Sequence, residues 1–192
     1  MSRRQRNLIG PQGMGGLVSS WGASSLFKSI QTGTRNMQSA TTVNETISAV
    51  DTNNAICLTR GSQYTTDADA NDHTFYYARL ASSTLVEMVR VGGGSGTITC
   101  TYTVLEFRPG LIKSLQAGTI TLGGGQTSNT ATITSVDTGK SVCLWAGNAN
   151  AAGSSQASAY GTLTLTNATT VTVARNTGVA GIVTAYVIVE FF

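Results

Sequence analysis

An internal repeat is the sequence feature that most constrains the fold. The segment "FKSIQTGT" at 27–34 returns as "IKSLQAGT" at 112–119, and "ISAVDTNNAICLTRG" at 47–61 is matched by "ITSVDTGKSVCLWAG" at 133–147. Two later pairs also match: "SSTLVEMVR" (82–90) with "NATTVTVAR" (167–175), and "TYTVLEF" (101–107) with "AYVIVEF" (185–191). Because the offset stays between 84 and 86 residues, one supersecondary unit has been used twice.

The pattern within each unit is typical of β-structure. In "TITCTYTVLEF" apolar residues alternate with threonines, and "GTLTLTNATTVTVAR" shows the same period of two, which places one set of side chains on each face of a sheet. Glycine-rich turns such as "GGGSG" (92–96) and "GGGQ" (123–126) separate the runs. We expect about six strands per unit, and a short helix is credible only within 19–30.

The boundary between the units lies at "EFRPGL" (106–111). Pro109 cannot donate a hydrogen bond to a sheet, and Gly110 adopts any turn. The sequence therefore predicts an all-β protein of two tandem, homologous β-sandwich or jelly-roll-like domains, at 27–108 and 109–192, preceded by an extended N-terminal arm at 1–26.

Composition excludes several classes of protein. Charged residues make up only 11% of the chain, and no run approaches 18 apolar residues, so a transmembrane helix is excluded. The start of the chain is basic, but Pro11 and three glycines interrupt the apolar segment that a signal peptide needs. We therefore expect a protein that is made and kept in a cytoplasm and has no membrane partner.

The three cysteines indicate buried, reduced thiols rather than a disulfide framework. Cys57 and Cys143 occupy equivalent places in the two copies, so each is expected in its own core. A Cys57–Cys143 bond is the less favoured alternative. Cys100, on an expected strand, could pair across subunits after release into an oxidising medium.

No constellation of residues predicts catalysis, a metal or a cofactor. His73 is the only histidine and lies in a polar segment with Asp67, Asp69 and Asp72, which we interpret as a solvated loop rather than a calcium site. Glu106 and Glu190 are equivalent residues of the two final strands, so they indicate a repeated structural role rather than a glycosidase pair. The sequence predicts that the protein is not an enzyme.

The N-terminal arm carries the densest basic run, "SRRQR" at 2–6, and the remaining chain has nine basic and nine acidic residues. Such an arm can contact nucleic acid or an acidic protein surface. Because apolar residues follow it, we favour an arm that orders against a protein partner, and nucleic acid is unlikely. The residues expected to form this anchor are Arg3, Arg4, Arg6, Leu17, Val18, Trp21, Leu26 and Phe27.

The repeated unit resembles tandem β-repeat virion proteins of tailed bacteriophages. The resemblance rests on Lys113, Ser114, Gln116, Gly118 and Thr119, on 136–138, 164–175 and 189–191, and on their partners in the first copy. It covers about 165 of the 192 residues. These family members are small Thr- and Gly-rich β domains associated with tail, fibre, neck or head-decoration genes.

The resemblance implies a non-enzymatic structural component that coats or reinforces the head or the neck and tail. Its partners would be capsid, neck or tail subunits, and it would form a homo-oligomer, with a trimer favoured. It would be assembled in the host cytoplasm and located in the virion. The alternative is a receptor-binding or carbohydrate-binding fibre module, for which "TFYYARL" (74–80) is the best candidate patch, while Trp145 lies next to expected core.

Overall fold

The computed structural model describes residues 26–38, 40–64, 75–92, 97–150, 160–178 and 180–192. The all-β prediction is confirmed, and these residues form twelve strands. The strands are β1 (Phe27–Met37), β2 (Thr42–Thr46), β3 (Ala55–Tyr64), β4 (Tyr77–Ser82), β5 (Leu85–Val89), β6 (Ile98–Phe107), β7 (Ile112–Leu122), β8 (Ser128–Thr132), β9 (Ser141–Asn150), β10 (Thr162–Asn167), β11 (Thr170–Ala174) and β12 (Ile182–Phe191).

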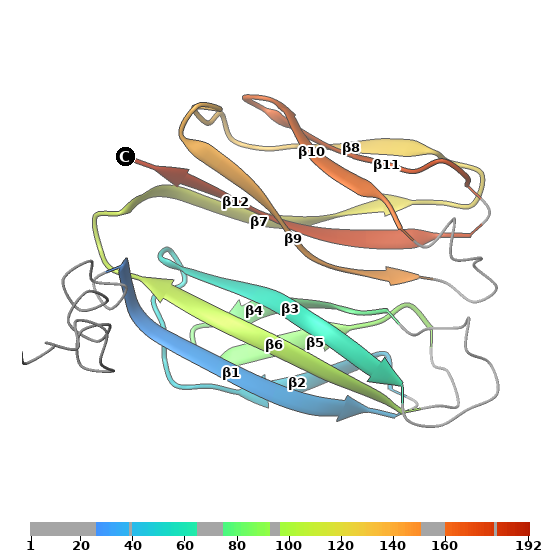
Figure 1. The fold of residues 1–192 in the computed structure, drawn as a ribbon, viewed down its shortest axis with the longest axis horizontal. Coiled ribbons are helices and arrows are strands. Elements are labelled where there is room, and N and C mark those ends of the chain that lie inside the picture. Colours follow the sequence, from blue (N-terminus) through green and yellow to red (C-terminus); the bar gives the residue numbers. More distant parts are fainter. Residues whose placement is uncertain (1–25, 39, 65–74, 93–96, 151–159, 179) are drawn as a thin grey trace, which may run out of the picture.

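The two halves of the chain, 26–108 and 109–192, share one strand order (Figure 1). In the first half, β1-β6-β3 and β2-β5-β4 form two three-stranded layers, and in the second half β7-β12-β9 and β8-β11-β10 do the same. Within the described ranges, each half therefore has six strands in two layers, which is a β-sandwich-like arrangement. Strand β1 begins at Phe27, so the short helix considered at 19–30 is wrong for 27–30. Residues 19–25 lie outside the described residues.

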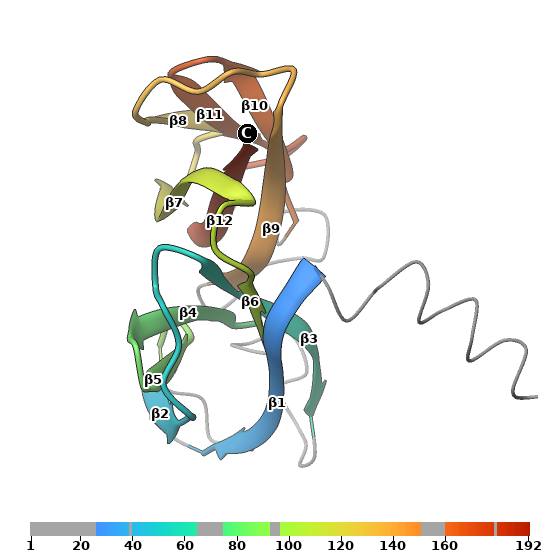
Figure 2. The same cartoon turned by 90° about the vertical axis from the view of Figure 1, so that its left-hand side faces the viewer.

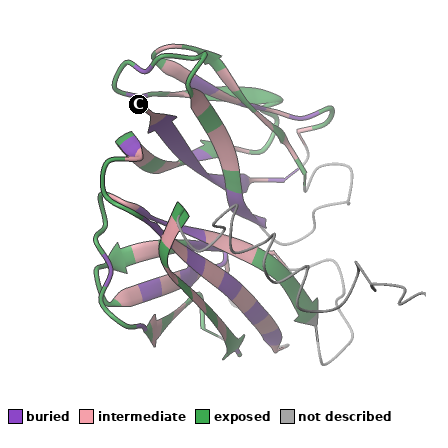
Figure 3. Cartoon of the chain, turned by 60° about the vertical axis from the view of Figure 1, so that its left-hand side comes forward, coloured by how far each residue is buried: buried purple, intermediate pink, exposed green. Residues whose placement is uncertain are grey.

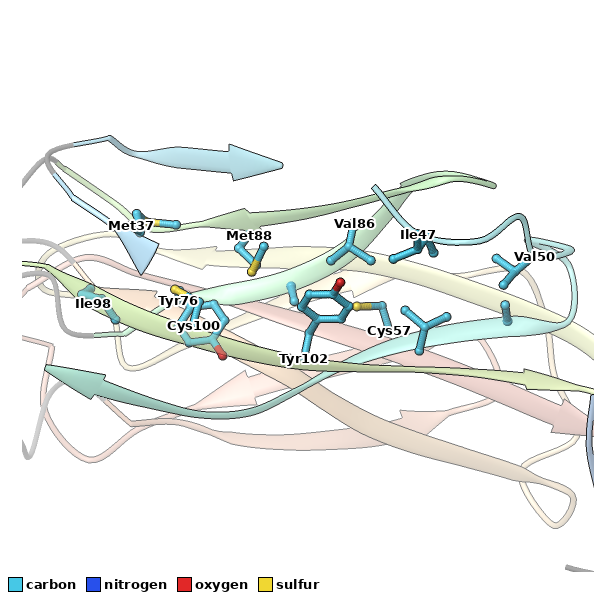
Figure 4. Close-up of a cluster of buried hydrophobic side chains, with 13 residues drawn as sticks. Met37, Ile47, Val50, Cys57, Tyr76, Val86, Met88, Ile98, Cys100 and Tyr102 are labelled. Atoms are coloured by element: carbon cyan, nitrogen blue, oxygen red, sulfur yellow. The ribbon is translucent and has the colours of Figure 1, made fainter. Parts of the chain in front are cut away.

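The core of the first half lies between its two sheets (Figure 4). Along β6, Ile98, Cys100, Tyr102 and Val104 are at most 3% exposed, while the threonines between them are half-buried. Met88 of β5 reaches the same core from the opposite sheet. The alternation in the sequence therefore sets which face of the sheet is buried.

A second core fills the sandwich of the other half, and a third lies between the halves. Strand β12 serves both: Ile182 and Ile188 point into the second sandwich, while Val187 and Val189 pack in the inter-half core. Figure 3 shows β12 buried along most of its length. A strand buried on both faces reads as a continuous apolar run, as "YVIV" at 186–189 does.

The glycines of the repeated motif make room for tyrosines. Gly118 on β7 pairs with Tyr186 on β12, and a Cβ at Gly118 would lie 2.6 Å from the Tyr186 hydroxyl oxygen. Gly33 pairs with Tyr102 in the first half, and a Cβ there would also overlap the tyrosine ring. Each motif glycine is therefore required by a close approach, not by its backbone angle.

The motif glutamines fasten the loop that follows β2 or β8. Gln31 donates to the carbonyl of Ser48 at 3.0 Å and accepts from the amide of the same residue at 2.8 Å. Gln116 makes the same two bonds with Thr134, at 2.9 and 2.7 Å. A side-chain amide that pairs with one peptide group in both directions fixes the loop against the sheet, because it satisfies a donor and an acceptor together.

Candidate functional site

Each of the two equivalent glutamates is held by the same three groups, a set that we name the carboxylate clamp. In the first half the clamp is Glu106 with Lys28, Ser29 and the backbone amide of Asp51. In the second half Glu190 is held by the counterparts of these residues. Lys28 contacts Glu106 Oε1 at 2.7 Å, Ser29 donates to Oε2 at 2.8 Å, and the Asp51 amide donates to Oε1 at 3.0 Å. The carboxylate is only 2% exposed. Both carboxylate oxygens therefore accept hydrogen bonds from within the first half.

The second clamp repeats the first almost atom for atom. Lys113 contacts Glu190 Oε1 at 2.7 Å, Ser114 donates to Oε2 at 2.9 Å, and the Asp137 amide donates to Oε1 at 3.0 Å. The Lys113 ammonium, then the Asp137 amide and the Ser114 hydroxyl, lower the pKa of Glu190 to about 2. A carboxyl with so low a pKa stays ionised near neutral pH, so it is a poor general acid.

The contacts of Glu106 also favour its ionised form, although burial opposes them more strongly than at Glu190. Burial raises the pKa of its carboxyl, but the hydrogen bonds from Lys28, the Asp51 amide and Ser29 together leave that pKa below its usual value. Because both copies make the same contacts, the clamps join the first and last strands of each half to the loop between β2 and β3 or between β8 and β9. This is the repeated structural role that the sequence predicts.

Each half also contains a buried arginine that donates hydrogen bonds to backbone carbonyls, Arg90 in the first half and Arg175 in the second. Arg175 donates to the carbonyls of Gln126 and Gly123, both at 2.9 Å, and of Ala180 at 2.5 Å, and burial lowers its pKa. Arg90 makes the equivalent contacts with the carbonyls of Ala40 and Gln38. Neither arginine was singled out for this role from the sequence, although both end a matched segment, "EMVR" and "TVAR".

A hollow between the halves has a volume of about 780 Å³. We name it the inter-half groove. Its walls come from β3, from 78–82 on β4 and the following Ser83, from Leu115 and 117–119 on β7, and from 185–187 on β12. Most side chains there are small or apolar, such as Ala81 and Ala117, and the exposed cross-strand pair of Arg79 with Glu87, 2.5 Å apart, lies at its side. The described residues that line the groove are therefore mainly small or apolar, with charged side chains only at its side.

The stretch 74–80, expected as the best aromatic patch, does not present Tyr76 or Tyr77 at the surface, because both rings are buried. Tyr76 is 4% exposed and packs in the first core, where its hydroxyl donates to the Gly61 carbonyl at 2.7 Å. Tyr77 is 7% exposed and packs in the inter-half core. The two rings lie on opposite faces of the chain: the first half's own core covers Tyr76, and the packing of the second half covers Tyr77.

Exposed aromatic side chains occur instead at Trp145 and Tyr160 of the second half, where the Phe75 ring of the first half lies 5.0 Å from that of Tyr160. Trp145 is 46% exposed and Tyr160 is 55% exposed, and the neighbour of Trp145, Ala146, is buried in the inter-half core. Trp145 and Tyr160 line a hollow of about 310 Å³ together with Asn148 and Gly161. Gly161 stands where the first half has Tyr76, so the ring that fills this position in one half is missing from the other.

The cysteines are free thiols, and the Cys57–Cys143 bond is not formed. Burial raises the pKa of Cys57 and of Cys100 to about 12, and that of Cys143 to about 11. Cys100 is fully buried in the first core, so it is not presented for pairing with another subunit.

Of the predicted anchor residues, the structure describes Leu26 and Phe27. Phe27 opens β1, and its ring lies 5.0 Å from that of Phe107 between centroids, while Leu26 is 42% exposed and accepts a hydrogen bond from the Arg108 amide. Arg3, Arg4, Arg6, Leu17, Val18 and Trp21 lie outside the described residues, as do His73, Asp67, Asp69 and Asp72.

Comparison of the chain with protein-family models, with curated proteins and with solved structures found no match. Among the residues that the structure describes, no helix is long and apolar enough to cross a membrane. Within the same ranges, no three His, Cys, Asp or Glu side chains gather as metal ligands would.

Proposed function

We propose that the chain is a non-enzymatic structural component of a bacteriophage virion, which coats or reinforces the head or the neck and tail. In this proposal the two halves are tandem, homologous β-sandwich domains that form the body, and residues 1–26 are the anchoring arm. The partners are capsid, neck or tail subunits and further copies of the chain, with a trimer favoured. Assembly takes place in the host cytoplasm.

The duplicated carboxylate clamp carries this proposal. A catalytic carboxylate needs an approach for substrate and a pKa suited to proton transfer, whereas Glu106 and Glu190 are at most 2% exposed and each accept three hydrogen bonds from the protein. Because the same contacts occur in both halves, we infer that they stabilise a feature that the two halves share. That shared property is the fold, so the buried charges support a body rather than an active site.

The inter-half core supports a rigid body. Phe107 at the end of β6 lies 6.2 Å from Phe191 at the end of β12, and Ile56 of β3 joins the same apolar cluster. Strands β4 and β9 also pair at Tyr77 and Gly147, which makes one six-stranded sheet across the halves. Two sandwiches fixed in one orientation present a constant surface, as a subunit of a symmetric particle requires.

The proposal is tested by comparing the full chain with a variant that lacks residues 1–25. This variant keeps Leu26, whose carbonyl accepts a hydrogen bond from Arg108. We expect light scattering to give a discrete oligomer for the full chain, and sedimentation with purified particles to recover the full chain but not the shortened one. A full chain that is monomeric and does not sediment with particles would contradict the proposal.

A matched pair of arm variants separates charge from apolar anchoring. Replacing Leu17, Val18 and Trp21 by Ser should abolish particle binding, whereas replacing Arg3, Arg4 and Arg6 by Gln should weaken it mainly at low salt, because exposed charges are screened. The reverse order of effects would indicate an electrostatic partner instead.

The exposed aromatic pair favours receptor or carbohydrate binding as the second candidate function. Aromatic faces beside amide groups are common in sugar sites because they offer an apolar platform with hydrogen-bonding edges. Trp145, Tyr160 and Asn148 provide this combination around one hollow. A glycan array compared between the full chain and Trp145→Ala tests the idea, and binding to host-surface glycans that the variant loses would support it over the structural role.

A further inference from the structure

Among the described residues, one edge of strand β4 is mostly without a partner strand. On one side β4 pairs with β5 from Tyr77 to Ser82, but on the other side, within those same described ranges, it pairs with β9 only at Tyr77. Beyond this point the two strands diverge, and the inter-half groove opens along 78–83. An open strand edge presents backbone amides and carbonyls that can pair with an added strand.

The size of the groove matches one extended chain. The free edge from Ala78 to Ser82 is five residues, which corresponds to about 17 Å at a rise of about 3.3 Å per residue. A strand takes up about 4.8 Å within its sheet and about 10 Å between packed layers, so five residues fill about 800 Å³. The groove measures about 780 Å³.

The side chains around the groove also suit an added strand of small residues. Ala81 and Ala117 are exposed on its two walls, with Gly118 and Ala185 beside them. No described side chain of β4 except Arg79 carries a charge, and Arg79 is paired with Glu87. A peptide rich in Gly, Ser and Ala would therefore fit between β4 and the outer face of β7 and β12.

We infer that a stretch of residues 14–25 from a second copy of the chain adds to the free edge of β4 in the inter-half groove. This inference rests on the proposed function, because it assigns the site that receives the anchoring arm. The segment reads "MGGLVSSWGASS", in which eight of twelve residues are Gly, Ser or Ala, with Leu17 and Val18 available for the apolar walls.

The position of β1 favours a neighbouring copy over the chain's own arm. Figure 2 shows β1 and β4 on opposite sides of the first half, and they belong to different sheets of the sandwich. Phe27 packs on the inter-half core, which also separates the start of β1 from the groove. The residues directly before Leu26 would have to pass around this core to reach their own β4, whereas a second copy can supply them directly.

Disulfide trapping between two full-length variants tests the inference. One chain carries Ala81→Cys, and the other carries an affinity tag and a cysteine at position 17, 18 or 20. Oxidation of the mixture should give a tagged–untagged dimer for at least one arm position, and mass spectrometry should identify the joined peptides. Two cysteines bridge only when their Cα atoms come within about 7 Å, so the bond reports direct proximity.

The repeat supplies a matched control. Thr166 on β10 is exposed and equivalent to Ala81, but it does not line the groove. Thr166→Cys should not form the dimer with the same arm variants, and the unmodified chain mixed with the arm variants controls for the native thiols. Ala117→Trp, which fills the groove, should lower the oligomer mass toward 19.9 kDa, while Thr166→Trp should leave it unchanged.

The outcomes separate this inference from the proposed function. If the full chain is an oligomer but Ala81→Cys gives no intermolecular bond, gives only an intrachain bond, or reacts no better than Thr166→Cys, the groove is not the arm's site and the structural role stands. If the full chain is a monomer that does not bind particles, both fail.

Discussion

Replacing Gly118 by Ala is expected to destabilise the protein, although alanine is usually the better residue in a strand. The new Cβ would lie 2.6 Å from the hydroxyl oxygen and 2.8 Å from Cζ of Tyr186. Tyr186 is 7% exposed and belongs to the second core, so its ring has little room to withdraw. The substitution therefore overpacks a filled site.

The magnitude follows from two opposing effects. Overpacking a core costs about 1–3 kcal/mol, while the loss of glycine's freedom in the unfolded chain returns about 0.4–1 kcal/mol. The net loss in the free energy of unfolding should be about 1–2 kcal/mol. For a chain of this size each kcal/mol lowers Tm by about 2–4 °C, so a fall of about 2–8 °C is expected.

Urea denaturation followed by circular dichroism, together with calorimetry, measures this change. Gly123→Ala is the control, because its Cβ would meet Gln126 at an ordinary 3.4 Å. In a Tyr186→Leu background the cost of Gly118→Ala should shrink, since the clashing ring is gone. The reasoning is refuted if Gly118→Ala is as stable as the parent, or if its cost is the same in both backgrounds.

Three further predictions concern the clamps, the arginines and the thiols. Glu190 has a folded pKa of about 2 against an ordinary 4.5, so its stabilising effect is present above about pH 4.5 and is lost as pH falls toward 2; urea midpoints for Glu190→Gln should be lower than the parent's at neutral pH and converge with them in acid, and parallel pH curves would contradict this. Arg175→Lys should cost about 3 kcal/mol, because an ammonium cannot reproduce the planar donors that reach three carbonyls; a loss below about 0.5 kcal/mol in calorimetry would show that these bonds matter little. Cys57 should react with Ellman's reagent only after denaturation, because burial raises its pKa to about 12, and rapid labelling of the folded protein would contradict the buried placement.

The strands could be predicted from the sequence where one face is buried and the other is not. The Thr alternation of 97–107 gives β6 almost to the residue. The run at 161–175 alternates just as well, yet it is two strands, because the Asn167 side chain accepts from the Thr169 amide and turns the chain between β10 and β11. Alternation alone does not show such a turn, since threonine continues through it.

The contacts between the halves could not be predicted in the same way. Tyr77 and Ile56 lie on faces that a single sandwich would expose, and they are buried only because the second half packs there. The repeat indicates two similar units but contains no information about their orientation. The inter-half groove depends on that orientation, so no local sequence pattern in 78–83 or 115–119 predicts it.

Strand β12 has a consequence for synthesis on the ribosome. It lies between β7 and β9, pairs with both, and supplies side chains to two cores. A nascent chain can close β1-β6-β3 once Phe107 has emerged, but the second sandwich and the junction both wait for 182–191. Prematurely terminated products that lack this segment would expose two apolar surfaces at once, which makes them recognisable to chaperones and proteases before they can enter an assembly.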